Sequence, residues 1–232
     1  MLDHKNYKDK SIPDVAKELD HLCKELDQKH RQQRKVQFLL DVRGYFIINK
    51  IKGNYVEFGI YRGEMVYCAW KILQETGCIK KYIGLDSFSG NPDISVSERK
   101  VNQTTLAGSY KAGLQQTDKF LRQFIKNKLK LIPGDFRKKN IIERAKDSKN
   151  KIALAVIDCN LMSSIEKSIK FAVPNMVRGG ILFVDDFFIN MYAGNCPILS
   201  LMKNIERKNN CKIIEFQTYA PFARAFIVIN PS

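Results

Sequence analysis

The stretch Tyr55–Gly63, Tyr-Val-Glu-Phe-Gly-Ile-Tyr-Arg-Gly, decides how the rest of the chain is interpreted. A short apolar run carries an acid near its end, two glycines follow four residues apart, and a helical pattern begins after them. This order predicts a strand, a tight turn and a helix N-terminus, where backbone N–H groups approach a ligand closely. Gly59 and Gly63 would leave room for that ligand, and Glu57 would face it as an acceptor. The same spacing fits a strand that merely packs on a helix, so the remaining sequence must decide.

Apolar runs and helical patterns alternate along the chain after this turn. The runs predict strands at 55–58, 81–85, 129–132, 151–157, 181–184, 211–216 and 224–229. Besides the helix after Gly63, apolar spacing predicts helices at 117–127, 141–146, 165–177 and 197–208. The last two strands are expected to pair antiparallel. The alternation indicates an α/β fold with a doubly wound, mostly parallel, seven-stranded Rossmann-like sheet.

Two segments lie outside this alternation. Residues 1–50 are predicted to form an N-terminal helical extension, and residues 51–232 the main domain. The extension would cover the sheet, close over a ligand or join two copies of the chain, and a homo-oligomer through these helices is expected. Residues 91–112 have turn residues and weak periodicity, which predicts a long, mobile, lid-like loop.

The net charge of +15 is the unusual bulk property of the chain. Such a surface attracts nucleic acid, anionic lipid or a negatively charged small substrate, although a solvated basic surface without a partner fits equally well. The chain begins with charged residues and has no apolar run long enough to cross a bilayer. No membrane span and a cytoplasmic location are therefore expected.

Histidine and cysteine usage excludes some kinds of chemistry. All three histidines lie within the first 30 residues, at His4, His21 and His30. This placement excludes Ser-His-Asp and Cys-His machinery in the globular part. The six cysteines contain no Cys-x-x-Cys pair, which favours buried free thiols over disulfides or a zinc site; they are Cys23, Cys68, Cys78, Cys159, Cys196 and Cys211.

Four predicted strands end in an acid: Glu57, Asp86, Asp158 and Asp185. In an open α/β sheet the ligand lies outside the carboxyl ends of the strands, where these acids would gather. Asp86 has the position of an acid that binds the two hydroxyls of a ribose. The cofactor would be a nicotinamide dinucleotide or S-adenosylmethionine, and the absence of a Gly-x-Gly-x-x-Gly spacing argues against the dinucleotide.

Asp158, Asp185 and Asp186 supply oxygen ligands on two strand ends. Such a cluster suits a hard divalent cation such as Mg²⁺. Ordinary capping of the following helices explains each acid singly, whereas the adjacent pair favours a metal.

Five motifs in order resemble the macrocin and mycinamicin type of sugar O-methyltransferases, which are class I S-adenosylmethionine-dependent enzymes that need Mg²⁺. The motifs are Val56–Gly63, Gly84–Pro92, Pro133–Phe136, Ile157–Leu161 and Gly179–Phe187. The resemblance spans about residues 36 to 230, and the ordered set is far more specific than any one motif.

The resemblance implies roles for individual residues. It implies that Glu57, Gly59 and Gly63 lie against the methionine end of the cofactor, with Tyr61 and Arg62 in the same turn, and that Asp86 holds the ribose. The residues implied around the adenine are Ser87, Phe88, Gly134, Asp135 and Phe136. Asp158, Asp185 and Asp186 match the family's metal ligands, and Asp158 also lies beside the cofactor and the reacting groups.

One residue departs from the resembled family, in which an Asp-x-Asp pair supplies the general base. Asn160 stands at the base position here and accepts no proton at neutral pH. The leading hypothesis is methyl transfer to a hydroxyl of a sugar or sugar-containing metabolite, with an anionic acceptor steered by Arg99, Lys100 and Lys111. The alternatives are a nucleic-acid methyltransferase or binding module, and an inactive relative that acts as an interaction protein.

Overall fold

The computed structural model describes residues 33–93, 106–188, 196–219 and 223–230, and these contain a seven-stranded sheet in the order β3-β2-β1-β4-β5-β7-β6. The strands are β1 (Gly53–Phe58), β2 (Ile79–Asp86), β3 (Leu129–Pro133), β4 (Ile152–Ile157), β5 (Met176–Val184), β6 (Lys212–Tyr219) and β7 (Ala223–Ile229). The first five run parallel, and β7 is antiparallel to both β5 and β6. The predicted doubly wound α/β fold is confirmed.

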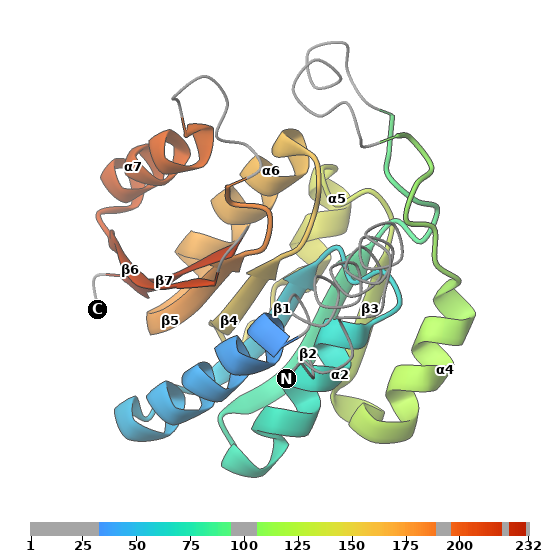
Figure 1. Cartoon of the computed structure of the whole chain (residues 1–232), viewed down its shortest axis with the longest axis horizontal. Helices are drawn as coiled ribbons and strands as arrows, with labels where there is room; N and C mark the ends of the chain where they lie inside the picture. Colours follow the sequence, from blue (N-terminus) through green and yellow to red (C-terminus); the bar gives the residue numbers. More distant parts are fainter. Residues whose placement is uncertain (1–32, 94–105, 189–195, 220–222, 231–232) are drawn as a thin grey trace, which may run out of the picture.

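Helices cover both faces of this sheet (Figure 1). Residues 33–49 form a helix on one face, beside α2 (Glu64–Leu73) and α4 (Leu114–Ile125). The other face carries α5 (Lys139–Ile142), α6 (Met162–Ala172) and α7 (Pro197–Asn209). Short 3₁₀ turns continue four of these helices: η2 (Gln74–Thr76), η3 (Lys126–Lys128), η4 (Glu143–Ala145) and η5 (Val173–Asn175).

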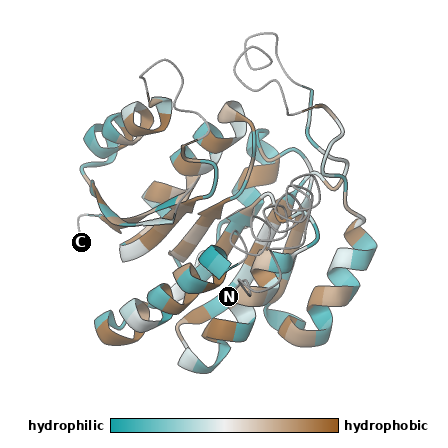
Figure 2. Ribbon diagram, viewed as in Figure 1, coloured by the Kyte–Doolittle hydropathy of each residue, from teal (hydrophilic) through white to brown (hydrophobic). Residues whose placement is uncertain are grey.

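The central strands β1 and β4 are buried along their whole length. Because helices cover both faces, such strands are apolar at nearly every position instead of alternating. Figure 2 shows the same division, with hydrophobic strands between helices of mixed character. The polar exceptions in β1 are Asn54 and Glu57, each only 1% exposed, so each needs a partner inside the protein.

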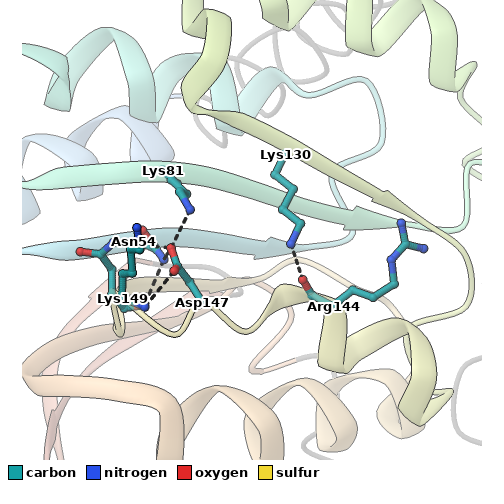
Figure 3. A network of polar contacts seen from close by, with 7 residues as sticks. Asn54, Lys81, Lys130, Arg144, Asp147 and Lys149 are labelled. Atoms are coloured by element: carbon teal, nitrogen blue, oxygen red, sulfur yellow. Dashed lines mark hydrogen bonds and ion pairs between the residues drawn. The ribbon is translucent and has the colours of Figure 1, made fainter.

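Asn54 belongs to a polar network at the amino ends of the strands (Figure 3). The Asp147 carboxylate accepts hydrogen bonds from Asn54 Nδ2 at 3.2 Å and from the Lys149 N–H at 3.0 Å. Lys81 Nζ on β2 forms an ion pair with the same carboxylate at 2.9 Å. These hydrogen bonds, chiefly that of Lys149, lower the pKa of Asp147. The network ties β1, β2 and the turn before β4 together at the end of the sheet opposite the strand-end acids.

The segment between the predicted helix at 165–177 and the predicted strand at 181–184 is where two predicted boundaries are wrong. The helix expected at 165–177 ends at Ala172, and the strand expected at 181–184 begins at Met176. Pro174 explains the early end, because proline has no N–H for the helical ladder. The strand residues from Met176 onward were not predicted because Gly179 interrupts their apolar pattern. Gly179 has a φ of +80° and lies beside a register shift between β4 and β5.

The predicted lid at 91–112 is described only at its ends, because residues 94–105 lie outside the described residues. The ends are held together: the Asn91 N–H donates to Ser109 O at 2.8 Å, and the Gly108 N–H donates to Asn91 O at 2.9 Å. Other predictions outside the described residues concern the helices before residue 33 and the residues His4, His21, His30, Cys23, Arg99 and Lys100.

The cysteine prediction holds for the described part of the chain, where all five cysteines are free thiols. Cys78, Cys159 and Cys211 are buried, and Cys68 and Cys196 are half-buried.

Among the helices of the described residues, none combines the length and the apolar character needed to cross a membrane.

Candidate active site

A cavity of about 370 Å³ opens at the carboxyl ends of β1, β2, β4 and β5. The parallel strands bring their terminal acids to this edge, as the sequence predicted. The predicted site residues that line it are Glu57, Gly59, Tyr61, Arg62, Asp86, Ser87, Asp135, Phe136, Asp158, Asn160, Asp185 and Asp186.

Three predicted cofactor residues do not line the cavity: Gly63, Phe88 and Gly134. Gly63 has a φ of +82°, and a Cβ there would lie 2.8 Å from Leu121 Cδ1 on α4. A glycine is required at this position for the backbone turn and for helix packing, not for a ligand. Gly134 likewise packs on Ile141, whose Cδ1 would lie 3.1 Å from an added Cβ.

Gly59 lines the cavity, but the neighbouring strand end explains the glycine. Its φ is +90°, and a Cβ would lie 2.0 Å from the backbone oxygen of Asp158. The space that the sequence analysis assigned to a ligand is therefore taken by the backbone that follows β4. This close approach places the β1 turn directly beside Asp158.

Asp86 is fixed by the two turns that follow β1 and β2. Its Oδ2 accepts a hydrogen bond from the Tyr61 N–H at 2.9 Å, and its Oδ1 accepts one from the Phe88 N–H at 2.7 Å. Burial raises the pKa of Asp86, while these N–H groups favour its charged form. Each carboxylate oxygen has a second lone pair, so the side chain can still accept from a ligand hydroxyl.

Glu57 is enclosed at the floor of the cavity. The Tyr55 hydroxyl donates a hydrogen bond to Glu57 Oε2. Burial, followed by repulsion from Asp158, raises the pKa of Glu57 to about 8. The group therefore holds a proton at neutral pH unless a cation enters the cavity beside it.

Asp135 and Phe136 lie at the β3 side of the cavity. The Asp135 carboxylate is engaged by Arg137, with Nε to Oδ1 at 3.0 Å and Nη2 to Oδ2 at 2.9 Å. Burial alone would raise the pKa of Asp135, but this bidentate pair outweighs it and lowers the pKa. Phe136 is buried edge-on against Phe58, with ring centroids 5.7 Å apart, and provides an apolar wall.

Tyr61 forms an aromatic rim with residues that the sequence analysis did not connect. Tyr110, near the end of the predicted lid at 91–112, meets the Tyr61 ring edge-on with centroids 6.0 Å apart. The Arg62 guanidinium lies 4.9 Å from the centroid of the same ring. Tyr61 and Tyr110 both adopt a positive φ, of 50° and 59°, which is uncommon for residues other than glycine.

Lys35 is the functional side chain that the sequence analysis missed. It comes from helix 33–49 and lines the cavity. Its Nζ lies 2.7 Å from Asp158 Oδ2 and 3.1 Å from Asp185 Oδ2. Burial alone would lower the pKa of Lys35, but the two carboxylates outweigh it and raise the pKa above its ordinary value. Lys35 is therefore a cation held between two strand ends.

A signal for Lys35 was present in the sequence. Residues 29–35 form a basic run, and Lys35 at its end lies three and four residues before Phe38 and Leu39. That spacing places Lys35 on the buried face of its helix. A lysine on a buried face needs a carboxylate partner, and the strand-end acids were the candidates.

The residues as arranged do not fit the predicted divalent cation. Within the described residues, no group of three His, Cys, Asp or Glu side chains surrounds a point that could hold a metal ion. Asp158 and Asp185 instead share the Lys35 ammonium, at distances typical of charged hydrogen bonds. Asp186 and Asn160 line the same cavity. The metal triad and Mg²⁺ stay predictions that this arrangement does not support.

Comparison with known proteins agrees with the fold. The profile of the macrocin-O-methyltransferase (TylF) family matches residues 28–205, most of the chain. No curated protein is matched in sequence.

Several solved structures share the fold at low sequence identity. The calicheamicin methyltransferase CalS11 superimposes with a TM-score of 0.65 at 16% identity, over 94% of this chain and 87% of that one. The O-methyltransferase NovP gives 0.62 at 19% identity, over 84% and 79%. TomG from Streptomyces achromogenes, solved with S-adenosylmethionine, gives 0.51 at 8% identity, over 84% and 80%.

The family match covers the helix that carries Lys35 and all the strand ends that form the cavity. The chain therefore belongs to the macrocin O-methyltransferase family and is an S-adenosylmethionine-dependent O-methyltransferase.

Proposed function

We propose that the chain transfers the methyl group of S-adenosylmethionine to a hydroxyl of a sugar or of a sugar-containing small molecule. The observation that carries this proposal is the position of Asp86, held by the Tyr61 and Phe88 N–H groups in the same cavity as Asp158 and Asn160. The sugar acceptor is supported by the family and by CalS11, which is described as a TDP-rhamnose 3′-O-methyltransferase.

We divide the lining of the cavity between the two reactants. Asp86 and Phe136 offer a hydroxyl acceptor and an apolar wall, which suit the ribose and the adenine of the cofactor. We assign the methionine end to the neighbourhood of Glu57 and Tyr61. The other half, around Asp158, Asn160 and Asp185, is left for the acceptor.

Methyl transfer depends mainly on how the protein positions the methyl donor and the acceptor hydroxyl. Bound S-adenosylmethionine supplies an electrophilic methyl group on a sulfonium. The acceptor oxygen forms the new O–C bond as the S–C bonding electrons return to sulfur, and the hydroxyl proton passes finally to solvent. Aligning donor and acceptor within one enclosed cavity accounts for a large part of such an acceleration. Among the chain's groups, Asn160 is assigned to hydrogen-bond the acceptor.

An anionic acceptor, such as a nucleotide-linked or acidic sugar, fits the charge of the chain. The net charge is +15, and Arg62 stands at the cavity rim. Exposed Lys111 lies near the rim residue Tyr110 in sequence. Long-range attraction of this kind raises the rate of encounter and weakens as salt screens it.

The proposed reaction does not include the divalent cation that the sequence predicts. The sequence predicts Mg²⁺ at Asp158, Asp185 and Asp186, and the ion pairs of Lys35 compete with it for two of these ligands. No step above passes through a metal.

The test combines binding with turnover. S-adenosylhomocysteine is titrated into the protein by calorimetry, and a panel of nucleotide sugars is then incubated with the protein and methyl-labelled S-adenosylmethionine. Saturable binding at one site and label on a sugar hydroxyl are expected. Absence of S-adenosylhomocysteine binding would overturn the cofactor assignment, and label found only on nucleic acid would overturn the acceptor.

A further inference from the structure

We infer that the Lys35 ammonium is the resident cation of the acceptor half of the cavity and excludes a divalent metal from it. The inference concerns which cation balances Asp158 and Asp185, and it rests on the proposed function only in calling that half the acceptor side. Its evidence is the position of one lysine relative to two strand ends.

The backbones of Asp158 and Asp185 are placed independently of Lys35. The Asp158 N–H donates to Phe58 O at 2.9 Å, and the Asp185 N–H donates to Ile157 O at 2.9 Å, so each acid continues the ladder of its strand. Two carboxylates held side by side repel each other, and a cation between them relieves that repulsion. The sheet therefore offers a place for a cation at this edge.

The helix that carries Lys35 is also anchored independently. Phe38, one turn after Lys35, stacks on Phe183 of β5 with ring centroids 4.2 Å apart. Asp41 accepts a hydrogen bond from the Tyr219 hydroxyl at 2.8 Å. These contacts fix the helix against β5 and β6, and they set Lys35 above the carboxyl ends of β4 and β5.

Lys35 meets both acids at the distances of charged hydrogen bonds, 2.7 Å and 3.1 Å. The Lys35 side chain is 22% exposed, that of Asp158 24% and that of Asp185 only 7%, so the pair with Asp185 is the better shielded from water. A lysine carries a tethered charge that is always present at the site, whereas a metal ion must be bound from solution. A divalent ion would have to displace the ammonium and leave it without partners in a largely buried place, which is costly.

The lysine supplies one positive charge where Mg²⁺ would supply two. It donates hydrogen bonds, but it has no vacant orbital to coordinate an acceptor oxygen. Lys35 is therefore assigned as a positioning residue that neutralises and orients Asp158 and Asp185. The assignment needs no change in the protonation of any of these groups.

In the experiment, Mn²⁺ is titrated into the metal-free full chain. Binding is measured by calorimetry and by the electron paramagnetic resonance signal of free Mn²⁺. The wild type is compared with Lys35→Met, which keeps the length of the stem and removes the charge. Lys170→Met removes an exposed lysine that pairs with Glu166 on α6 and serves as the matched control. Neither S-adenosylmethionine nor an acceptor is needed, so failure here is distinguishable from failure of the proposed function.

Lys35→Met is expected to bind one Mn²⁺ at least tenfold more tightly than the wild type and the Lys170→Met control. Adding Asp185→Asn to Lys35→Met should remove the gain. Equal Mn²⁺ affinity in the wild type and Lys35→Met would overturn the inference, whether that affinity is high or absent. If Lys35→Met does not fold, Lys35→Gln replaces it.

Discussion

The Tyr55 hydroxyl donates a hydrogen bond to the Glu57 carboxylate two residues further along β1, and both side chains are almost completely buried. The pair places a titratable group at the floor of the cavity, with a pKa raised to about 8 by burial and then by Asp158. Because residues i and i+2 of a strand share a face, the sequence alone places these two side chains together. The raised pKa follows from the helices and strands that cover them.

Glu57→Gln should stabilise the protein at alkaline pH. The folded-state pKa of about 8 lies above the usual value of a glutamate, so between about pH 4.5 and 8 the unfolded state loses a proton that the folded state keeps. Stability then falls as pH rises through this window. The variant lacks this loss and should gain about 1–3 kcal/mol over the wild type at pH 8, but little at pH 4.5.

Thermal melting at pH 5, 6.5 and 8 measures this difference, with Glu166→Gln on the exposed face of α6 as the control. If the difference in melting temperature between the wild type and Glu57→Gln stays constant over the three pH values, Glu57 ionises with an ordinary pKa.

Asp86→Asn should weaken binding of S-adenosylhomocysteine by roughly 10–100-fold. An amide offers one acceptor oxygen instead of two, and its NH₂ group faces a donor from Tyr61 or Phe88. Loss of a hydrogen bond to a charged group costs about 1.5–3 kcal/mol. Calorimetry checks this, with Asp118→Asn, an exposed partner of Arg122, as the control. Unchanged affinity in a folded variant would remove Asp86 from the cofactor site.

Gly63→Ala should lower stability and leave cofactor affinity within about threefold. The positive φ costs an alanine about 1–2 kcal/mol, and its Cβ must push Leu121 aside. Gly59→Ala should abolish both stable folding and cofactor binding. Its added Cβ would lie 2.0 Å from the backbone oxygen of Asp158, and no side-chain movement can remove that clash. Melting curves and S-adenosylhomocysteine titrations of the two variants check the contrast. A large loss of affinity in folded Gly63→Ala would restore the role that the sequence suggested.

Asn160→Asp should change turnover modestly once an acceptor is found. A positioned base typically contributes 10²–10⁴-fold, and Asn160 contributes none at neutral pH. If the acceptor needs no base from this position, the added carboxylate only places another negative charge beside Asp158, and the pH profile shifts. The measurement is initial rate against pH for both proteins. An inactive wild type beside an active Asn160→Asp would favour the interaction-protein alternative.

Much of the site was accessible from the sequence because local pattern and sheet topology determine it. The continuous apolar runs predict buried parallel strands, and parallel strands bring Asp86, Asp158 and Asp185 to one edge. The glycine turn after β1 was recognisable for the same reason, since a non-glycine residue there would need a rare backbone conformation. The motif order then identified the family.

The tertiary structure alone decided which partners these residues meet. Gly59 and Gly63 have the same predicted role in the sequence. In the structure, Gly59 faces the backbone of Asp158, whereas Gly63 faces Leu121 of α4. Lys35 reads as part of a charged run, and only the packing of Phe38 on Phe183 places it between two acids. Contacts between segments far apart in the chain depend on how helices dock, and no local periodicity encodes the docking. The sequence therefore placed the strand-end acids at one edge of the sheet, whereas the docking of the helix decided which two of them Lys35 meets.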